Sequence, residues 1–217
     1  LSLHDALPIC PQRLMKTLFT DEAYVKANVD EARLMRRLFD LACNMQSHDT
    51  DMQLYSLFTD EECYDLWSCN NLYWYLTHAC SPVTDGLMPY READLLRNIL
   101  DRADAALKEG KNQATLRFGH ESCLLPLVAL LELNHYGESY PDVEKLSEQW
   151  RAYDIFPMAS NVQFVFFHKK GSNDVLVKVL LNEKEAKLPV KTDVAPYYHW
   201  KDVESYYREK LDKYQHI

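Results

Sequence analysis

The sequence predicts an α/β protein in which a helical cap subdomain is followed by part of a sheet-containing core. Helical periodicity dominates the first half of the chain, whereas two β-prone runs, 162–168 and 175–181, come near the end and precede one more helical segment. Apolar residues make up 47% of the 217 residues and aromatic residues 12%. This composition is sufficient to bury a substantial core at this length.

Two long helices are expected before residue 80. Apolar residues recur at helical spacing over residues 21–45 with charged residues between them, which predicts one amphipathic helix. A second helix should cover residues 60–79, because Thr59 can cap its first amides and three acidic residues follow in the first turn. Proline and glycine then mark a turn-rich joint at residues 81–89.

This joint is the expected domain boundary. Residues 11–85 are assigned to the helical cap, and residues 86–217 to the C-terminal part of the α/β core. Residues 1–10 are left out of the fold prediction, because LSLHDALPI resembles a translated sequencing adapter. Since the chain starts without an initiator Met, a basic leader or an apolar leader, it is expected to begin inside a longer gene.

A helix, a strand and another helix are expected in succession after the joint. An apolar stripe predicts a helix over residues 90–108, and Gly110 is suited to the left-handed cap that ends it. Residues 114–118 form a candidate strand. Residues 122–133 are interpreted as a buried helix, with Pro126 tolerated in its first turn.

Strands are expected to dominate the rest of the chain up to its last helix. A short helix is predicted near residues 141–150. The runs 162–168 and 175–181 should pair as a hairpin, and residues 185–190 can add a third strand. The final helix is expected over residues 201–214, with its valine, leucine and tyrosine side chains facing inward.

Charge and hydropathy exclude several classes of partner. The formal net charge of −9 disfavours nucleic acid and anionic lipid, and the basic clusters are too short to override it. A polyanionic small molecule would therefore need a local positive pocket. No apolar run reaches the length of about 18 residues that a membrane span requires, so no membrane insertion is expected.

The six cysteines are too few to form a disulfide scaffold. Cys63, Cys69, His78 and Cys80 lie close in sequence, but their spacing matches none of the usual zinc patterns. We interpret these cysteines as packed thiols or as one disulfide, and expect no metal site.

The segment TLRFGHESCLLPL, residues 115–127, contains the residues best placed for chemistry. It puts His120 and Glu121 between the candidate strand and the start of the apolar helix. Amides at a helix N-terminus attract anions such as phosphate, and ligands gather outside the carboxyl ends of strands in α/β sheets. His120 and Glu121 are therefore the candidate site residues, although such a pair can also be purely structural. Arg117 is either a pocket residue or a surface residue.

This segment resembles the second signature of the histidine acid phosphatases, in which a His-Asp pair follows a strand and precedes an apolar helix. The inositol-polyphosphate branch of that family has His-Ala-Glu there. The present chain has His-Glu-Ser, so Glu121 occupies the Asp position and is one methylene longer. Residues 155–161, IFPMASN, followed by a strand, also resemble the family segment that returns to the sheet. The resemblance covers residues 11–217 and implies a histidine-phosphatase-like core.

The resemblance further implies a phosphomonoester hydrolase that acts on inositol polyphosphates such as phytate through a phosphohistidine, without a metal or organic cofactor. His120 and Arg117 would bind the phosphorylated substrate, and His120 would stabilise charge on the transferring oxygens. Glu121 would protonate the leaving alkoxide. Like other members of the family, the protein is expected to be periplasmic or secreted.

The first family signature, Arg-His-Gly-x-Arg-x-Pro, does not occur in the 217 residues. The chain is therefore interpreted as the proton-donor half of a longer enzyme and is expected to be inactive by itself. A different class remains open, namely a non-catalytic α/β protein that binds a small anion or a protein partner through the same helix start. The signature in the upstream reading frame would favour the enzyme.

Overall fold

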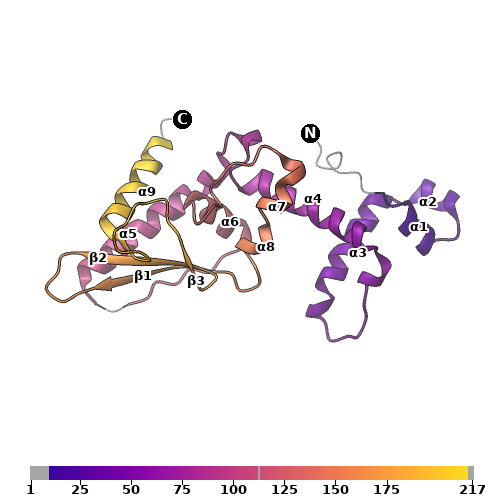
Figure 1. Ribbon diagram of the computed structural model, residues 1–217. Helices are drawn as coiled ribbons and strands as arrows, with labels where there is room; N and C mark the ends of the chain where they lie inside the picture. Colours follow the sequence, from indigo (N-terminus) through magenta and orange to yellow (C-terminus); the bar gives the residue numbers. More distant parts are fainter. Residues whose placement is uncertain (1–9, 112, 215–217) are drawn as a thin grey trace. The chain divides into compact units, whose positions relative to one another are not determined.

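The computed structural model describes residues 10–111 and 113–214 and combines helices with an antiparallel sheet, which confirms the α/β class (Figure 1). The expected non-native segment 1–10 lies, apart from Cys10, outside the described residues. None of the helices in the described ranges is both long and apolar enough to cross a membrane.

The chain divides into two compact units between Tyr73 and Trp74, within one helix. The boundary expected near residue 85 therefore lies inside the second unit. The assignment of residues 11–85 to a cap and of residues 86–217 to a core stays a prediction.

The first unit is helical. It contains α1 (Gln12–Leu18), α2 (Glu22–Asn28), α3 (Glu31–Asn44), the 3-10 turns η1 (Met45–Ser47) and η2 (Tyr55–Leu57), and the start of α4 (Asp60–His78). The single helix expected over residues 21–45 is wrong. The chain becomes extended at Val29, and Asp30 caps α3 by accepting a hydrogen bond of 3.1 Å from the Arg33 amide. The apolar periodicity continues across this break because α2 and α3 contribute to the same core.

Helix α4 confirms the capping expected at Thr59. The Thr59 hydroxyl accepts a hydrogen bond from the Glu62 amide at 3.2 Å, and the Glu62 carboxylate accepts one from the Thr59 amide at 2.9 Å. This reciprocal pair satisfies two amides that the helix itself leaves unbonded. Arg13 donates to the same carboxylate at 2.5 and 2.7 Å, and this contact lowers the pKa of Glu62. The start of α4 is thereby tied to α1.

The second unit contains the end of α4 and the later helices of the described residues. These are η3 (Pro82–Thr84), η4 (Met88–Glu92), α5 (Ala93–Glu109), α6 (Glu121–Leu130), η5 (Val143–Lys145), α7 (Leu146–Gln149), α8 (Ala152–Ile155) and α9 (Trp200–Tyr214). Gly110 ends α5 in the left-handed conformation, with φ of 65°, as expected. Pro126 lies beyond the first turn of α6, contrary to expectation, and is buried there.

The sheet has the strand order β1-β2-β3, with β4 also paired to β2. Its strands are β1 (Val162–His168), β2 (Val175–Leu181), β3 (Lys184–Ala186) and β4 (Tyr198–His199), and all of the pairings are antiparallel. The hairpin of β1 and β2 is confirmed at its expected bounds. The third strand ends at Ala186 instead of reaching residue 190, because the backbone N–H and C=O of Lys187 bond to Asn134 instead, each at 2.9 Å.

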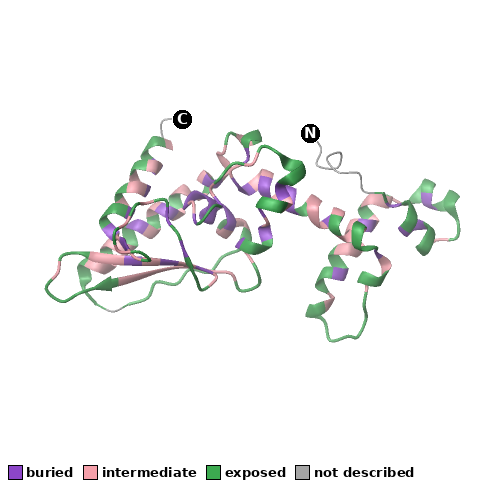
Figure 2. Cartoon of the chain, viewed as in Figure 1, coloured by how far each residue is buried: buried purple, intermediate pink, exposed green. Residues whose placement is uncertain are grey.

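The strand expected at residues 114–118 is wrong. Residues 113–120 have no regular secondary structure, and the segment is exposed (Figure 2). Leu116 and Phe118 are 75% and 94% exposed. A strand needs a neighbouring backbone to bond its amides and carbonyls. Within the described residues, the four strands of the sheet pair only with one another, so this segment has no such neighbour.

Helix α6 is the central helix of the second unit. Its residues Leu125–Leu130 are buried, and η4 packs against it. At its C-terminal end, the hydroxyl of Tyr207 donates to the Leu131 carbonyl and the ammonium of Lys210 donates to the Leu130 carbonyl, both at 2.7 Å. Helix α9 therefore supplies donors for carbonyls that α6 leaves without intrahelical partners.

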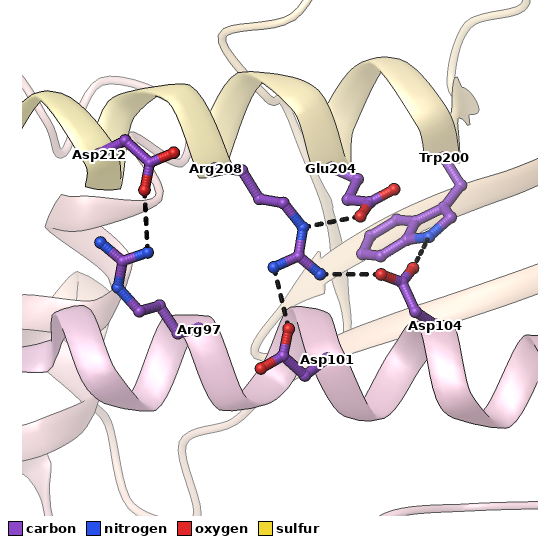
Figure 3. Close-up of polar contacts among 7 residues, drawn as sticks. All are labelled: Arg97, Asp101, Asp104, Trp200, Glu204, Arg208 and Asp212. Carbon is purple, nitrogen blue, oxygen red and sulfur yellow. Dashed lines mark hydrogen bonds and ion pairs between the residues drawn. The ribbon is translucent and has the colours of Figure 1, made fainter.

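An ionic network joins α9 to α5, which lies beside it (Figure 3). Arg208 donates to Asp101 at 2.9 Å, to Asp104 at 2.8 Å and to Glu204 at 2.7 Å. Asp104 also accepts a hydrogen bond from the Trp200 indole at 2.9 Å. Burial raises the pKa of Asp104, but these hydrogen bonds outweigh burial, so its pKa is lowered overall. The network therefore fixes α9, the helix whose Tyr207 and Lys210 bond to the last carbonyls of α6.

The bond from Tyr207 to α6 can be tested by removing a single oxygen. Tyr207→Phe should lower the free energy of unfolding by about 1–3 kcal/mol, because the buried Leu131 carbonyl loses its donor. Urea unfolding followed by circular dichroism measures the change. Tyr197→Phe is the matched control, since the Tyr197 ring contacts Phe167 and the substitution keeps that ring. Equal stability of the two variants would contradict the role given to the Tyr207 hydroxyl.

Candidate functional site

His120 and Glu121 lie at the start of α6, as the sequence predicts, but an irregular segment precedes them instead of the expected strand. His120 is the N-terminal cap residue in an extended conformation, and its carbonyl accepts hydrogen bonds from the amides of Cys123 at 3.0 Å and Leu124 at 3.1 Å. Its side chain makes no capping hydrogen bond. Glu121 is the first helical residue, and both side chains are exposed. The imidazole and the carboxylate are thus presented together at the positive end of a helix dipole.

Arg117 is held by a different element. Its guanidinium donates a hydrogen bond of 2.8 Å to the side-chain oxygen of Asn98 on α5, and both residues are exposed. The segment that carries Arg117 is not a strand, so strand alternation does not decide which way its side chain points. The structure therefore places Arg117 against α5, and its role in substrate binding stays a prediction.

A buried histidine outside the predicted pair, His78, lies within electrostatic reach of Glu121. His78, the last residue of α4, is only 7% exposed, its Nδ1 atom is 2.7 Å from the Thr77 hydroxyl, and its ring centroid is 4.6 Å from that of Trp74. Burial lowers the pKa of His78, the positive charge of Arg91 lowers it further, and the negative charge of Glu121 opposes them. Arg91 and Glu121 are therefore both within electrostatic reach of the same imidazole.

Arg91 belongs to η4, the turn that packs against α6, and its side chain is exposed. Its positive charge and the negative charge of Glu121 act on the same imidazole, that of His78. No pattern in the sequence indicated this, because Arg91 and Glu121 are far apart along the chain and only the packing of η4 on α6 brings their elements together.

The cysteines are thiols. All six are free, and burial raises the pKa of Cys63, Cys69 and Cys80, the last to about 11. The packed-thiol interpretation is confirmed for these three, whereas Cys10, Cys43 and Cys123 are exposed. Across the described ranges, no group of three or more histidine, cysteine or carboxylate side chains is arranged to hold a metal ion.

A hollow of about 530 Å³ lies elsewhere in the second unit. It is lined by residues of the β2–β3 turn, of α8 and the segment after it, and of the segment after α6, among them Asn134, Tyr153, Met158 and Asn182, and by none of the candidate site residues. Arg117, His120 and Glu121 are themselves exposed.

The fold and the site together describe an α/β protein that presents a histidine and a carboxylate at the start of a buried helix. Residues 6–182 match the family model of the histidine phosphatase superfamily (branch 2). The chain belongs to this superfamily.

Two relatives illustrate the similarity. Human multiple inositol polyphosphate phosphatase 1 is 28% identical over 134 residues, which cover 56% of this chain and 27% of the human protein. The multiple inositol polyphosphate phosphatase of Bifidobacterium longum has a similar fold. Its phosphate complex gives a TM-score of 0.71 at 21% identity, covering 84% of this chain and 40% of the bacterial one. Its inositol hexasulfate complex gives 0.67 at 21% identity, covering 82% and 38%. The chain thus spans well under half of either relative.

The exposure of the site residues predicts that they contribute little to stability. His120→Ala and Glu121→Gln should each change the free energy of unfolding by less than about 0.5 kcal/mol, as surface substitutions usually do. Thr59→Ala, which removes a capping hydroxyl, should cost about 1 kcal/mol. Urea unfolding of the three variants makes the comparison. A large loss with His120→Ala would indicate a structural role for that imidazole.

Proposed function

We propose that this chain is the proton-donor half of a phosphomonoester hydrolase that acts on inositol polyphosphates such as phytate. The observation that carries the proposal is the exposed His120-Glu121 pair at the start of α6, inside the region that matches the family. The named activity of the human and bacterial relatives supports the substrate class. The expected periplasmic or secreted location rests on the resemblance to the family.

In this proposal the nucleophilic histidine belongs to the rest of a longer protein. Its imidazole attacks phosphorus to form a phosphohistidine while the bond from phosphorus to the leaving oxygen breaks. Glu121 donates a proton to that oxygen, so an alcohol leaves rather than an alkoxide. A water molecule then gives a proton to Glu121 and attacks the phosphohistidine, which releases phosphate and regenerates both residues.

His120 and the first amides of α6 would bind the equatorial oxygens of the transferring group. A helix start favours negative charge there, and hydrogen-bond donors that are already oriented stabilise it without reorganisation. Arg91, which is exposed on η4 and close enough to influence His78, would add a further positive charge. Together, His120, the helix amides and Arg91 would supply part of the local positive charge that a protein with a net charge of −9 needs in order to bind a phosphate.

The role of Glu121 predicts a defect that depends on the leaving group. In the full-length protein, Glu121→Gln should slow hydrolysis of phytate by about 10²- to 10⁴-fold, the usual contribution of general acid catalysis. An activated aryl phosphate should be affected much less, because its leaving group needs no proton. Steady-state phosphate release from both substrates is the measurement. Equal losses on the two substrates would remove Glu121 from the acid role.

A matched control exploits the neighbouring residue. The double variant E121A/S122E moves the carboxylate one position along α6 and recreates the His-Ala-Glu order of the inositol-polyphosphate branch. It should recover much of the phytate hydrolysis that Glu121→Gln loses. Ser122→Ala alone should leave that hydrolysis nearly unchanged. A strong defect with Ser122→Ala would instead show that the Ser122 hydroxyl contributes to hydrolysis independently of Glu121.

The proposal also predicts that the 217-residue chain alone hydrolyses neither phytate nor an activated aryl phosphate. The nucleophile signature is absent from it, and a histidine beside the proton donor would approach phosphorus from the leaving-group side rather than in line. Mixing the chain with a separately expressed N-terminal half should restore turnover. Turnover by the chain alone would refute the half-enzyme assignment. Phosphate binding without turnover after mixing would favour the non-catalytic anion-binding alternative.

A further inference from the structure

His199 lies between two carboxylates that come from different segments. Its Nδ1 atom is 3.0 and 3.1 Å from the two carboxylate oxygens of Asp174, and its Nε2 atom is 2.9 Å from Oδ1 of Asp193. A neutral imidazole has one N–H, whereas carboxylates only accept hydrogen bonds. Both contacts can therefore exist together only when the ring is a protonated imidazolium.

The surrounding charges agree with this geometry. Hydrogen bonding to Asp174, and to a smaller extent to Asp193, raises the pKa of His199. The hydrogen bond with His199 in turn lowers the pKa of Asp193. The other charged side chains on neighbouring elements form no ion pair with the His199 ring. Lys178 on β2 pairs with Glu185 at 3.2 Å, and the first charged residues of α9, Lys201 and Asp202, form no ion pair with His199.

The three residues join three segments. Asp174 lies in the β1–β2 connection, Asp193 lies between β3 and β4, and His199 ends β4 directly before α9. The pairing of β4 with β2 involves only two residue pairs, Leu176 with His199 and Val177 with Tyr198. A contact at His199 therefore reinforces a short strand pairing at the point where α9 begins.

We propose that His199 is a protonation-dependent clamp that holds the connection between β3 and β4 at the start of α9 in acidic solution and releases Asp193 as the pH rises. The proposal is independent of the proposed function. Because the folded-state pKa is raised, the stabilisation is fully present below the unfolded value near 6.5 and is lost as the pH rises through the folded value. Asp193 is the contact that opens, since its side chain is 83% exposed, against 51% for Asp174.

Hydrogen exchange and an NMR titration of the 217-residue chain test the clamp. The imidazole of His199 should titrate above 6.5. Amide exchange over residues 190–197, corrected for intrinsic rate, should accelerate about threefold above that pH, the size expected for an exposed ion pair. His199→Gln should exchange at the fast, pH-independent level throughout. Asp193→Asn should lower the titration midpoint of His199.

His168→Gln is the matched control. The Nε2 atom of His168, at the end of β1, lies 2.8 Å from the carbonyl of Ser172 in the β1–β2 connection, a contact that one N–H satisfies. This variant should keep the pH dependence of the 190–197 segment. A midpoint for His199 at or below 6.5, or the same pH dependence in His199→Gln as in the unmodified chain, would overturn the proposal.

Discussion

Helix α6 imposes the main constraint on the second unit, because it is apolar around its whole circumference and has to be covered from every side. Residues Leu125–Leu130 of α6 are buried, and η4 packs against the helix. Helix α9 provides hydrogen-bond donors to the last carbonyls of α6. The covering elements come from before and after α6 in the sequence. Folding α6 therefore requires long-range packing, and that packing fixes the direction in which its first residues, the candidate site, are presented.

Elements with a local signature could be predicted from the sequence. The β1–β2 hairpin follows from two β-prone runs and a polar connection, and the end of α5 follows from Gly110. Two predictions failed for physical reasons. The periodicity across α2 and α3 records a shared core and does not register the capping by Asp30 that separates the helices. The β propensity of residues 114–118 does not provide the neighbouring backbone that a strand requires.

The candidate site was likewise predictable where it depends on local sequence and not where it depends on packing. His120 and Glu121 were located from an expected strand, turn and helix, of which only the start of the apolar helix α6 is present. His78 and Arg91 could not be located, because their proximity depends on how α4 and η4 pack against the rest of the unit. The contact of Arg117 with Asn98 was also invisible, since it joins an irregular segment to α5.

The two ends of α6 differ in a way that bears on the proposed chemistry. The C-terminal end is buried and bonded by α9, whereas the N-terminal end and the segment before it are exposed. A phosphate dianion held there by one imidazole, helix amides and a nearby arginine would remain incompletely neutralised, since solvent screens exposed charges. A productive site needs further cations and exclusion of water over this end. In the histidine acid phosphatases that this chain resembles, the arginines of the first signature meet the first need. The proposed activity is therefore assigned to a longer protein, to which this chain contributes the proton donor and part of the phosphate-binding groups.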